Sequence, residues 1–196
     1  MKIKVLTSLI VTVAFLAVGC HTEPTPDKPD KPAPTDGVVF TANYFDCEYY
    51  GDYYTPNIGN YYIHLSDSGF TESGYARPNS TYYRLALYSD LYDDAEGGAL
   101  RLPVGTYTLD TEDTLAHGTF SVAWSKYLRS DAEGEFSEEL SFEAGELRVT
   151  ESGAQLKVTI AGKEHTVTYE GEMVVADKRI DDGNDDDRPE GILSTL

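Results

Sequence analysis

Cysteine is scarce in this chain of 196 residues, which contains only Cys20 and Cys47. Two cysteines cannot build the disulfide framework that stabilises many small secreted domains, so a hydrophobic core must provide the stability. Cys47 lies in a strand-like segment, where we expect a small buried hydrophobic residue. The neighbouring sequence offers no partner base for a catalytic thiol.

Long apolar runs are also lacking. The longest, from Val5 to Val18, has about 14 residues, whereas roughly 20 are needed to cross a bilayer as a helix. It follows Lys2 and Lys4, and a positive start before a short apolar run is typical of a cleaved secretion signal. The sequence therefore predicts a signal peptide over residues 1–19.

Basic residues are few: 15 Lys and Arg stand against 34 Asp and Glu, a formal net charge of −19. Loss of Lys2 and Lys4 with the signal peptide takes that charge of −19 to −21. A chain this acidic is repelled by nucleic acid and by anionic bilayers, so we expect no nucleic-acid partner. Any membrane attachment must come from a lipid.

The residues that end the apolar run suggest such a lipid. Leu16-Ala17-Val18-Gly19-Cys20 resembles the bacterial lipobox. The resemblance implies that Cys20 begins the mature protein and carries a thioether-linked diacylglycerol and an acylated amino group. Two or more acyl chains anchor a protein stably, since each buried methylene contributes about 0.8 kcal/mol. The alternative is an ordinary signal peptide, with Cys20 as an unmodified thiol.

The mature chain divides by composition into three parts. Residues 20–37 hold the lipidated end and a linker with five prolines, which predicts an extended spacer. Residues 38–176 are rich in Tyr, Val, Thr and Phe and are long enough for one domain. Residues 177–196 include a run of aspartates and few apolar residues, so we expect a disordered acidic tail.

Apolar and polar residues alternate with a period of two along residues 38–176, which predicts about eight strands. The expected strands fall near residues 38–50, 61–65, 82–88, 107–109, 120–124, 147–149, 156–160 and 167–175. Glycine-containing connections at 151–153 and 161–163 favour hairpins, whereas 128–144 reads as a long loop or a broken strand. The predicted fold is all-β, a single antiparallel β-sandwich, with an up-and-down β-barrel as the alternative.

Tyrosines are concentrated in the first half of this domain, where 12 of the 15 lie between Tyr44 and Tyr92. The simplest explanation is that tyrosine suits a pleated, half-buried surface. The functional alternative is a face of exposed, nearly coplanar rings and a guanidinium that binds a sugar. In the expected strands, alternation points Ile63, Leu65, Leu85 and Leu87 toward the core and their polar neighbours away from it. The candidate ligand-binding residues for the outward face are Tyr62, His64, Tyr82, Arg84 and Tyr88, and Tyr49, Tyr50, Tyr53 and Tyr54 are candidates for the rim of a cleft.

Catalytic motifs are missing from the sequence. It has no Gly-x-Ser-x-Gly elbow, no glycine-rich phosphate loop and no His-Glu-x-x-His helix. Its four histidines do not have the spacing of zinc ligands. We therefore predict a protein that is not an enzyme and that has no metal and no cofactor.

The lipobox, the proline-rich spacer and a Tyr-rich domain with the segment Leu102-Pro103-Val104-Gly105-Thr106-Tyr107-Thr108 resemble surface and periplasmic lipoproteins of Bacteroidota. The resemblance implies a lipid-anchored protein of the cell envelope, at the outer membrane, in a group often encoded with glycan-uptake systems. We expect a non-catalytic glycan- or peptide-binding module. The alternative is a structural lipoprotein that packs against other envelope proteins.

Overall fold

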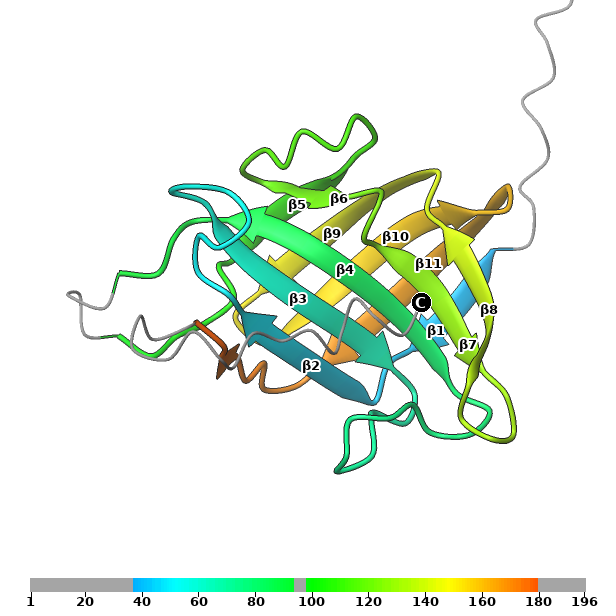
Figure 1. The fold of residues 1–196 in the computed structure, drawn as a ribbon. Helices are drawn as coiled ribbons and strands as arrows, with labels where there is room; N and C mark the ends of the chain where they lie inside the picture. Colours follow the sequence, from blue (N-terminus) through cyan, green and yellow to red (C-terminus); the bar gives the residue numbers. More distant parts are fainter. Residues whose placement is uncertain (1–36, 94–97, 180–196) are drawn as a thin grey trace, which may run out of the picture. The chain divides into compact units, whose positions relative to one another are not determined.

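The computed structural model describes residues 37–93 and 98–179. Cys20, the signal peptide and nearly all of the linker and the acidic tail lie outside the described residues. Twelve strands and no helices make up the described part (Figure 1). They are β1 (Val38–Thr41), β2 (Tyr44–Tyr49), β3 (Gly59–Ser66), β4 (Thr81–Ser89), β5 (Gly105–Asp110), β6 (Thr119–Ser121), β7 (Lys126–Ser130), β8 (Phe136–Ser141), β9 (Ala144–Thr150), β10 (Gly153–Ile160), β11 (Lys163–Glu170) and β12 (Ala176–Asp177).

The strands form one mixed sheet that curls into a half-barrel. Its order is β1-β11-β10-β9-β5-β6-β4-β3-β2-β12, and β7 and β8 continue from β4. The all-β class is confirmed, but the predicted sandwich is not seen, because the pairing runs unbroken and leaves no second sheet. Three pairs are parallel, β1 with β11, β5 with β6 and β12 with β2, so the sheet is not purely antiparallel.

The curl depends on a short connection between β1 and β2. Only Ala42 and Asn43 separate these strands, yet β1 pairs with β11 whereas β2 pairs with β3. The Ala42 amide donates to the Thr168 carbonyl (2.8 Å) and the next amide, of Asn43, donates to the Ser66 carbonyl (2.9 Å). One extended stretch of chain therefore pairs with strands near both ends of the sheet order, β11 and β3.

Both hairpins predicted from glycine are present. β9 and β10 are joined by Glu151 and Ser152, and β10 and β11 by Ala161 and Gly162. The last two residues have positive φ, 48° and 71°, as the central residues of a type I′ turn require. The expected three-stranded meander is therefore confirmed, although β11 ends at Glu170 and does not continue to Val175 as predicted.

Two other predicted segments differ from the structure. Residues 128–144 contain most of a hairpin, β7 and β8, with a register shift at Arg129 and Ser130. Conversely, the strand expected over 120–124 stops at Ser121, because residues 122–124 form a turn in which the Ser125 amide bonds back to the Ser121 carbonyl (3.0 Å). Trp124, the last residue of that expected strand, is 40% exposed in the turn.

The hydrophobic core lies on one face of the curled sheet. The predicted core positions Ile63, Leu65, Leu85 and Leu87 are all buried there. Cys47 is buried among them, which confirms it as a small core residue. Leu147 of β9 and Leu156 of β10 join the same cluster, so side chains from both halves of the sheet fill the core. Within the described residues, no helix has the length and apolarity needed to span a membrane.

Candidate ligand-binding groove

The five predicted site residues lie on one face of two neighbouring strands. β3 and β4 are antiparallel, and their register places His64 opposite Arg84. Core residues such as Ile63 and Leu85 occupy the odd positions, so the even positions face away from the core. Tyr62, His64, Tyr82, Arg84 and Tyr88 are the candidates at those even positions. Alternation thus predicted correctly which side chains share a face.

The exposed platform expected from these residues is not formed. Tyr82 and Tyr88 are buried, with 0% and 3% of their surface exposed. The rings of Tyr62 and His64 meet edge to face, at 71°, and so offer no common plane. Tyr49, expected at a cleft rim, is a buried core residue, and the Tyr54 ring packs edge to face on those of Tyr53 and Tyr50.

Phe70 and Phe136 cover the buried tyrosine of this face. The Tyr82 ring lies 4.9 Å from the Phe70 ring and 5.6 Å from the Phe136 ring, measured between centroids. Phe70 also contacts His64 at 4.9 Å, and His64 contacts Tyr62 at 5.5 Å. The five rings form an unbroken series across the strands, which we call the aromatic series. Within this series Tyr82 lies between Phe70 and Phe136 and is fully buried.

The hydroxyl of Tyr82 also holds the loop between β3 and β4. It donates a hydrogen bond to the Gly69 carbonyl (2.7 Å) and accepts one from the Arg77 amide (2.8 Å). These two bonds close the loop of residues 67–80 over the ring. The loop carries Phe70 and Tyr75, so Tyr82 sets the position of both aromatic side chains.

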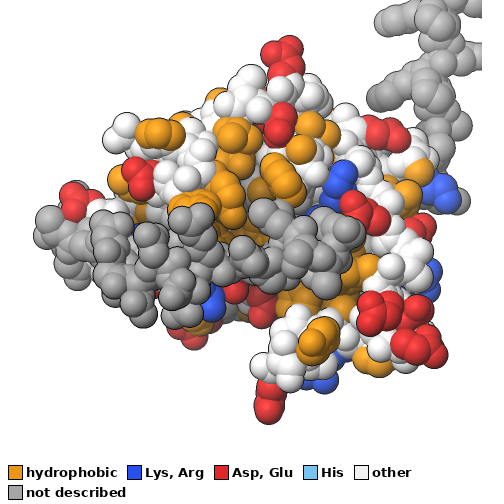
Figure 2. All heavy atoms as spheres, viewed as in Figure 1, with side chains coloured by type: hydrophobic (Ala, Val, Ile, Leu, Met, Phe, Trp, Pro, Cys, Tyr) orange, Lys and Arg blue, Asp and Glu red, His pale blue; other side chains and the backbone are white. Residues whose placement is uncertain are grey.

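A groove of about 820 Å³ lies beside this loop. Its walls come from β2, from the loop of residues 67–80, from hairpin β7–β8 and from the segment leading into β12. The lining includes Asp46, Glu48, His64, Phe70, Tyr75, Arg84, Leu128, Phe136, Val174 and Lys178. Tyr75, Phe136 and Val174 are 71%, 40% and 66% exposed, so they form an apolar rim open to solvent. Figure 2 shows hydrophobic side chains on this side of the molecule, with many acidic side chains around its outline.

Charged side chains are ordered across the groove by the strand register. Asp46 of β2 is opposite His64, His64 is opposite Arg84, and Arg84 is opposite Lys126 of β7. Arg84 is only 5% exposed, and its guanidinium lies 5.9 Å from the centre of the Tyr62 ring. Lys126 donates to the Ser141 hydroxyl (2.8 Å). Asp46, His64, Arg84 and Lys126 therefore form a row of side chains, with a carboxylate at the β2 end and two cations at the β4 and β7 end.

Burial and these charges shift two titrating groups. Burial, and secondarily the positive charge of Arg84, lowers the pKa of His64 to about 3, so its ring is neutral at physiological pH. Burial, and then the charge of Glu48, raises the pKa of Asp46. Glu48 itself accepts a hydrogen bond from Tyr50 (2.7 Å) and pairs with Lys178 (3.8 Å). The groove thus presents a neutral ring beside a buried cation.

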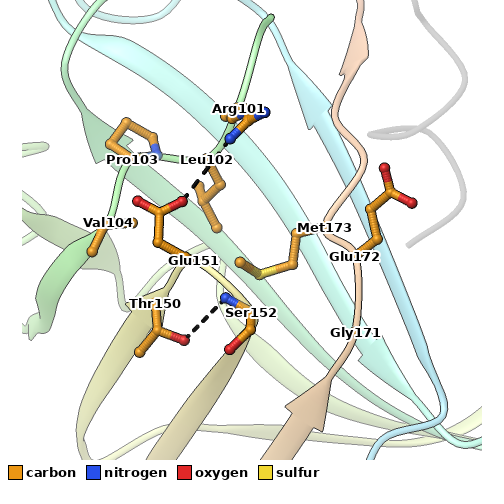
Figure 3. Close-up of a pocket in the computed structure, with 10 residues that line it drawn as sticks. All are labelled: Arg101, Leu102, Pro103, Val104, Thr150, Glu151, Ser152, Gly171, Glu172 and Met173. Carbon is orange, nitrogen blue, oxygen red and sulfur yellow. Dashed lines mark hydrogen bonds and ion pairs between the residues drawn. The ribbon is translucent and has the colours of Figure 1, made fainter.

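A second hollow, of about 730 Å³, lies where Arg101–Val104 and the β9–β10 turn meet residues 171–173 (Figure 3). Its charged pair, Arg101 and Glu151, is 4.0 Å apart, and both side chains are largely exposed. Its apolar lining comes from Leu102, Pro103, Val104 and Met173. No aromatic side chain lines it and its cation already has a partner, so it is the weaker candidate site.

The side chains that line the groove are of the kinds that bind ligands. It combines aromatic faces, a carboxylate and a guanidinium, which suit hydrogen bonding and stacking. The one thiol in the described region, Cys47, is buried, and burial raises its pKa well above the usual range. Across residues 37–93 and 98–179, no three His, Cys, Asp or Glu side chains are placed to hold a metal ion.

Sequence reasoning missed most of the groove walls. Phe70 and Tyr75 come from a loop, and Leu128 and Phe136 come from the hairpin β7–β8, a segment predicted mainly as a loop. The alternation of β8 is weak, because its residues are mostly exposed on both faces. The only signal for a covered face was the unusual number of tyrosines themselves.

Comparisons of the chain with protein-family models, with curated proteins and with solved structures found no match.

Proposed function

We propose that this chain is a non-catalytic glycan-binding lipoprotein of the bacterial envelope, anchored through Cys20 at the outer membrane. The observation that carries the binding function is the groove with its exposed aromatic rim. Pockets of about 300–1,000 Å³ that are mainly apolar, with a few converging polar groups, are the usual form of ligand sites. The groove has this size and composition.

The rim suits a sugar ring in particular. A pyranose has an apolar face, which packs on an aromatic ring, and hydroxyl groups at its edge, which need hydrogen-bond partners. Tyr75 and Phe136 supply exposed rings, the exposed Asp46 supplies an acceptor, and the buried Arg84 supplies a donor deeper in the groove. This pairing of exposed rings with a charged floor supports a glycan over a purely apolar ligand.

The anchoring is supported by the first 37 residues of the sequence, which precede the described strands. The positive start, the short apolar run and the lipobox-like residues before Cys20 are followed by a linker with five prolines. Growth on labelled palmitate should label the protein, and Cys20→Ser should remove the label and release the chain from membranes. An unlabelled parent protein would refute the anchor.

Affinity electrophoresis through gels containing immobilised polysaccharides tests the binding. The full-length chain in detergent is compared with Tyr75→Ala and Phe136→Ala. Trp124→Ala is the matched control, because Trp124 is 40% exposed, as Phe136 is, and does not line the groove. We expect retardation by at least one polysaccharide, lost in both groove variants and kept in the control. Equal retardation of all four proteins would rule out the groove.

The free edge of β8 favours a second function, assembly with other envelope proteins. In the described region β8 pairs only with β7, so its other edge is open to a strand of a partner. Glu138 and Glu139 lie on this strand, and charged residues are a common means of discouraging edge pairing. Crosslinking in cells should capture a stoichiometric partner if assembly is the role, and Ser137→Pro should abolish the capture.

A further inference from the structure

We propose that the groove is specific for acidic glycans, and that Arg84 binds the oxyanion of one sugar residue, either a uronate carboxylate or a sulfate ester. The proposal rests on the glycan-binding function assigned above to the same groove. The observation behind it is that the Arg84 guanidinium is buried in the floor of a groove whose rim is open to solvent.

The guanidinium of Arg84 is short of partners. Only 5% of the residue is exposed, and its Nε has no hydrogen-bond acceptor. None of the ion pairs among the described residues includes Arg84. Its main neighbours are aromatic: the Tyr62 ring lies 5.9 Å from Cζ, and His64 faces it across the β3–β4 register. A buried charged donor without an acceptor is unfavourable, and such groups are normally paired with a counter-ion.

Arginine is the side chain suited to this role. Its planar fork of donors matches the two oxygens of a carboxylate, and the same donors also bind sulfate oxygens. The fork is restrained here because the Arg84 guanidinium packs against the Tyr62 ring, with Cζ 5.9 Å from the ring centre, and the residue is only 5% exposed. Its guanidinium is therefore oriented before the ligand arrives, which reduces the entropy lost on binding.

Lys126 strengthens the positive end of the groove. It stands opposite Arg84 in the β4–β7 register, and its one contact in the described region is to the uncharged Ser141 hydroxyl. Neither of these two cations forms an ion pair among the described residues, although the chain has 34 acidic and 15 basic residues. Their excess charge favours an anionic group over a neutral one at this end.

Asp46 gives the groove a direction. It lies at the β2 end of the row that runs through His64 to Arg84 and Lys126. A carboxylate repels an anionic group but accepts hydrogen bonds from sugar hydroxyls. An acidic sugar chain therefore lies with its oxyanion toward β4 and β7 and with hydroxyl groups toward β2.

The test compares acidic polysaccharides with their own neutral forms. The full-length chain in detergent is run through gels containing a uronate polymer or a sulfated polymer, and through gels with the carboxyl-reduced or desulfated counterpart. Neutral galactan, mannan and xylan complete the panel. We expect binding to at least one acidic polymer, weakened about tenfold or more in its neutral form, as expected for the loss of a charge-assisted hydrogen bond. If carboxyl reduction weakens binding, the bound group is a carboxylate, and if desulfation weakens it, the bound group is a sulfate.

Substitutions show whether Arg84 is responsible for the preference for acidic polymers. Arg84→Gln and Lys126→Gln should each weaken binding to the acidic polymer and leave binding to its neutral form within about twofold, because only the charged contact is lost. Arg148→Gln on β9 is the control, because it removes the same charge at an exposed position away from the groove. Arg84→Lys keeps the charge without the fork, and should recover only part of the affinity.

The outcomes separate the two proposals. Binding of neutral and acidic polymers with equal strength, or equal effects of Arg84→Gln and Arg148→Gln, would overturn the acidic-glycan assignment and leave the glycan-binding function intact. Binding to no polymer in the panel would overturn both. Thermal melts provide a check on folding: Arg84→Met should be at least as stable as the parent. If Arg84→Met and Arg84→Gln both unfold, Arg84 is a structural residue and the assignment is wrong.

Discussion

Replacing Tyr82 by Phe should loosen the wall of the groove without opening the core. The change removes one oxygen atom, which donates to the Gly69 carbonyl (2.7 Å) and accepts from the Arg77 amide (2.8 Å). The ring is fully buried between Phe70 and Phe136, so a phenylalanine fills the same space. The effect therefore comes from the two hydrogen bonds alone.

The magnitude follows from those two bonds. Each contributes about 0.5–1.5 kcal/mol net, so Tyr82→Phe should lower the free energy of unfolding by roughly 1–3 kcal/mol. For a domain of this size, that corresponds to a fall in Tm of about 3–10 °C. If the loss is confined to the loop of residues 67–80, the Arg77 amide should exchange with solvent roughly 5- to 150-fold faster, the same free energy expressed as an equilibrium constant.

Tyr88→Phe is the matched control. Tyr88 is on the same strand and the same face and is 3% exposed, but its hydroxyl makes no hydrogen bond to the described residues. Urea unfolding gives the global stability of both variants, and hydrogen exchange read on peptides from residues 67–80 gives the local one. We expect a large effect for Tyr82→Phe and a change of less than about 0.5 kcal/mol for Tyr88→Phe. Equal effects in both measurements would refute the role of Tyr82 in holding the loop.

Three further predictions address acid stability, the thiols and a turn. Because the pKa of His64 is about 3 in the folded chain and near 6.5 when unfolded, its contribution to stability is complete above about pH 6.5 and is lost toward pH 3, at up to about 1.4 kcal/mol per unit. His64→Gln should flatten the fall of the urea midpoint in this range, and an unchanged slope would contradict the assignment. A colorimetric thiol assay should detect no reactive thiol in the native lipidated protein and one, Cys47, after denaturation, whereas two would show that Cys20 is unmodified. Ala161→Asn should stabilise the chain by a few tenths of a kcal/mol, because Asn tolerates positive φ better than Ala, and Ala161→Val should destabilise it in the same melts.

The faces of the strands could be predicted from the sequence because alternation is a local property. Ile63 and Leu85 were assigned to the core and His64 and Arg84 to the opposite face, as the structure has them. The β10–β11 turn was equally local, since Gly162 accommodates positive φ. In each case a few neighbouring residues contain the whole signal.

The architecture of the sheet could not be predicted in this way. The division of one extended stretch into β1 and β2 depends on partners far along the chain, and no local residue pattern marks Ala42 and Asn43 as the division. The same applies to the groove, whose floor residues were named from β3 and β4. Its walls come from Phe70 and Phe136, which reach Tyr82 only through tertiary folding.

The burial of Tyr82 shows where the functional expectation failed. Alternation indicates that a side chain faces away from the core, but it does not indicate what covers that second face. Here a loop and a hairpin cover part of it, so the outward tyrosine becomes a support for Phe70. Arg84 is covered too, and this burial is the feature that gives it a predicted role.

The pairing of β1 with β11 affects how the domain can be made. Val38–Thr41, at the start of the domain, find their partner strand only at His165–Thr168. A nascent chain emerging amino-terminus first must keep its opening strand unpaired until almost the whole domain has followed. Such a distant pairing slows folding, because the chain must close a loop of almost the whole domain before β1 gains its partner.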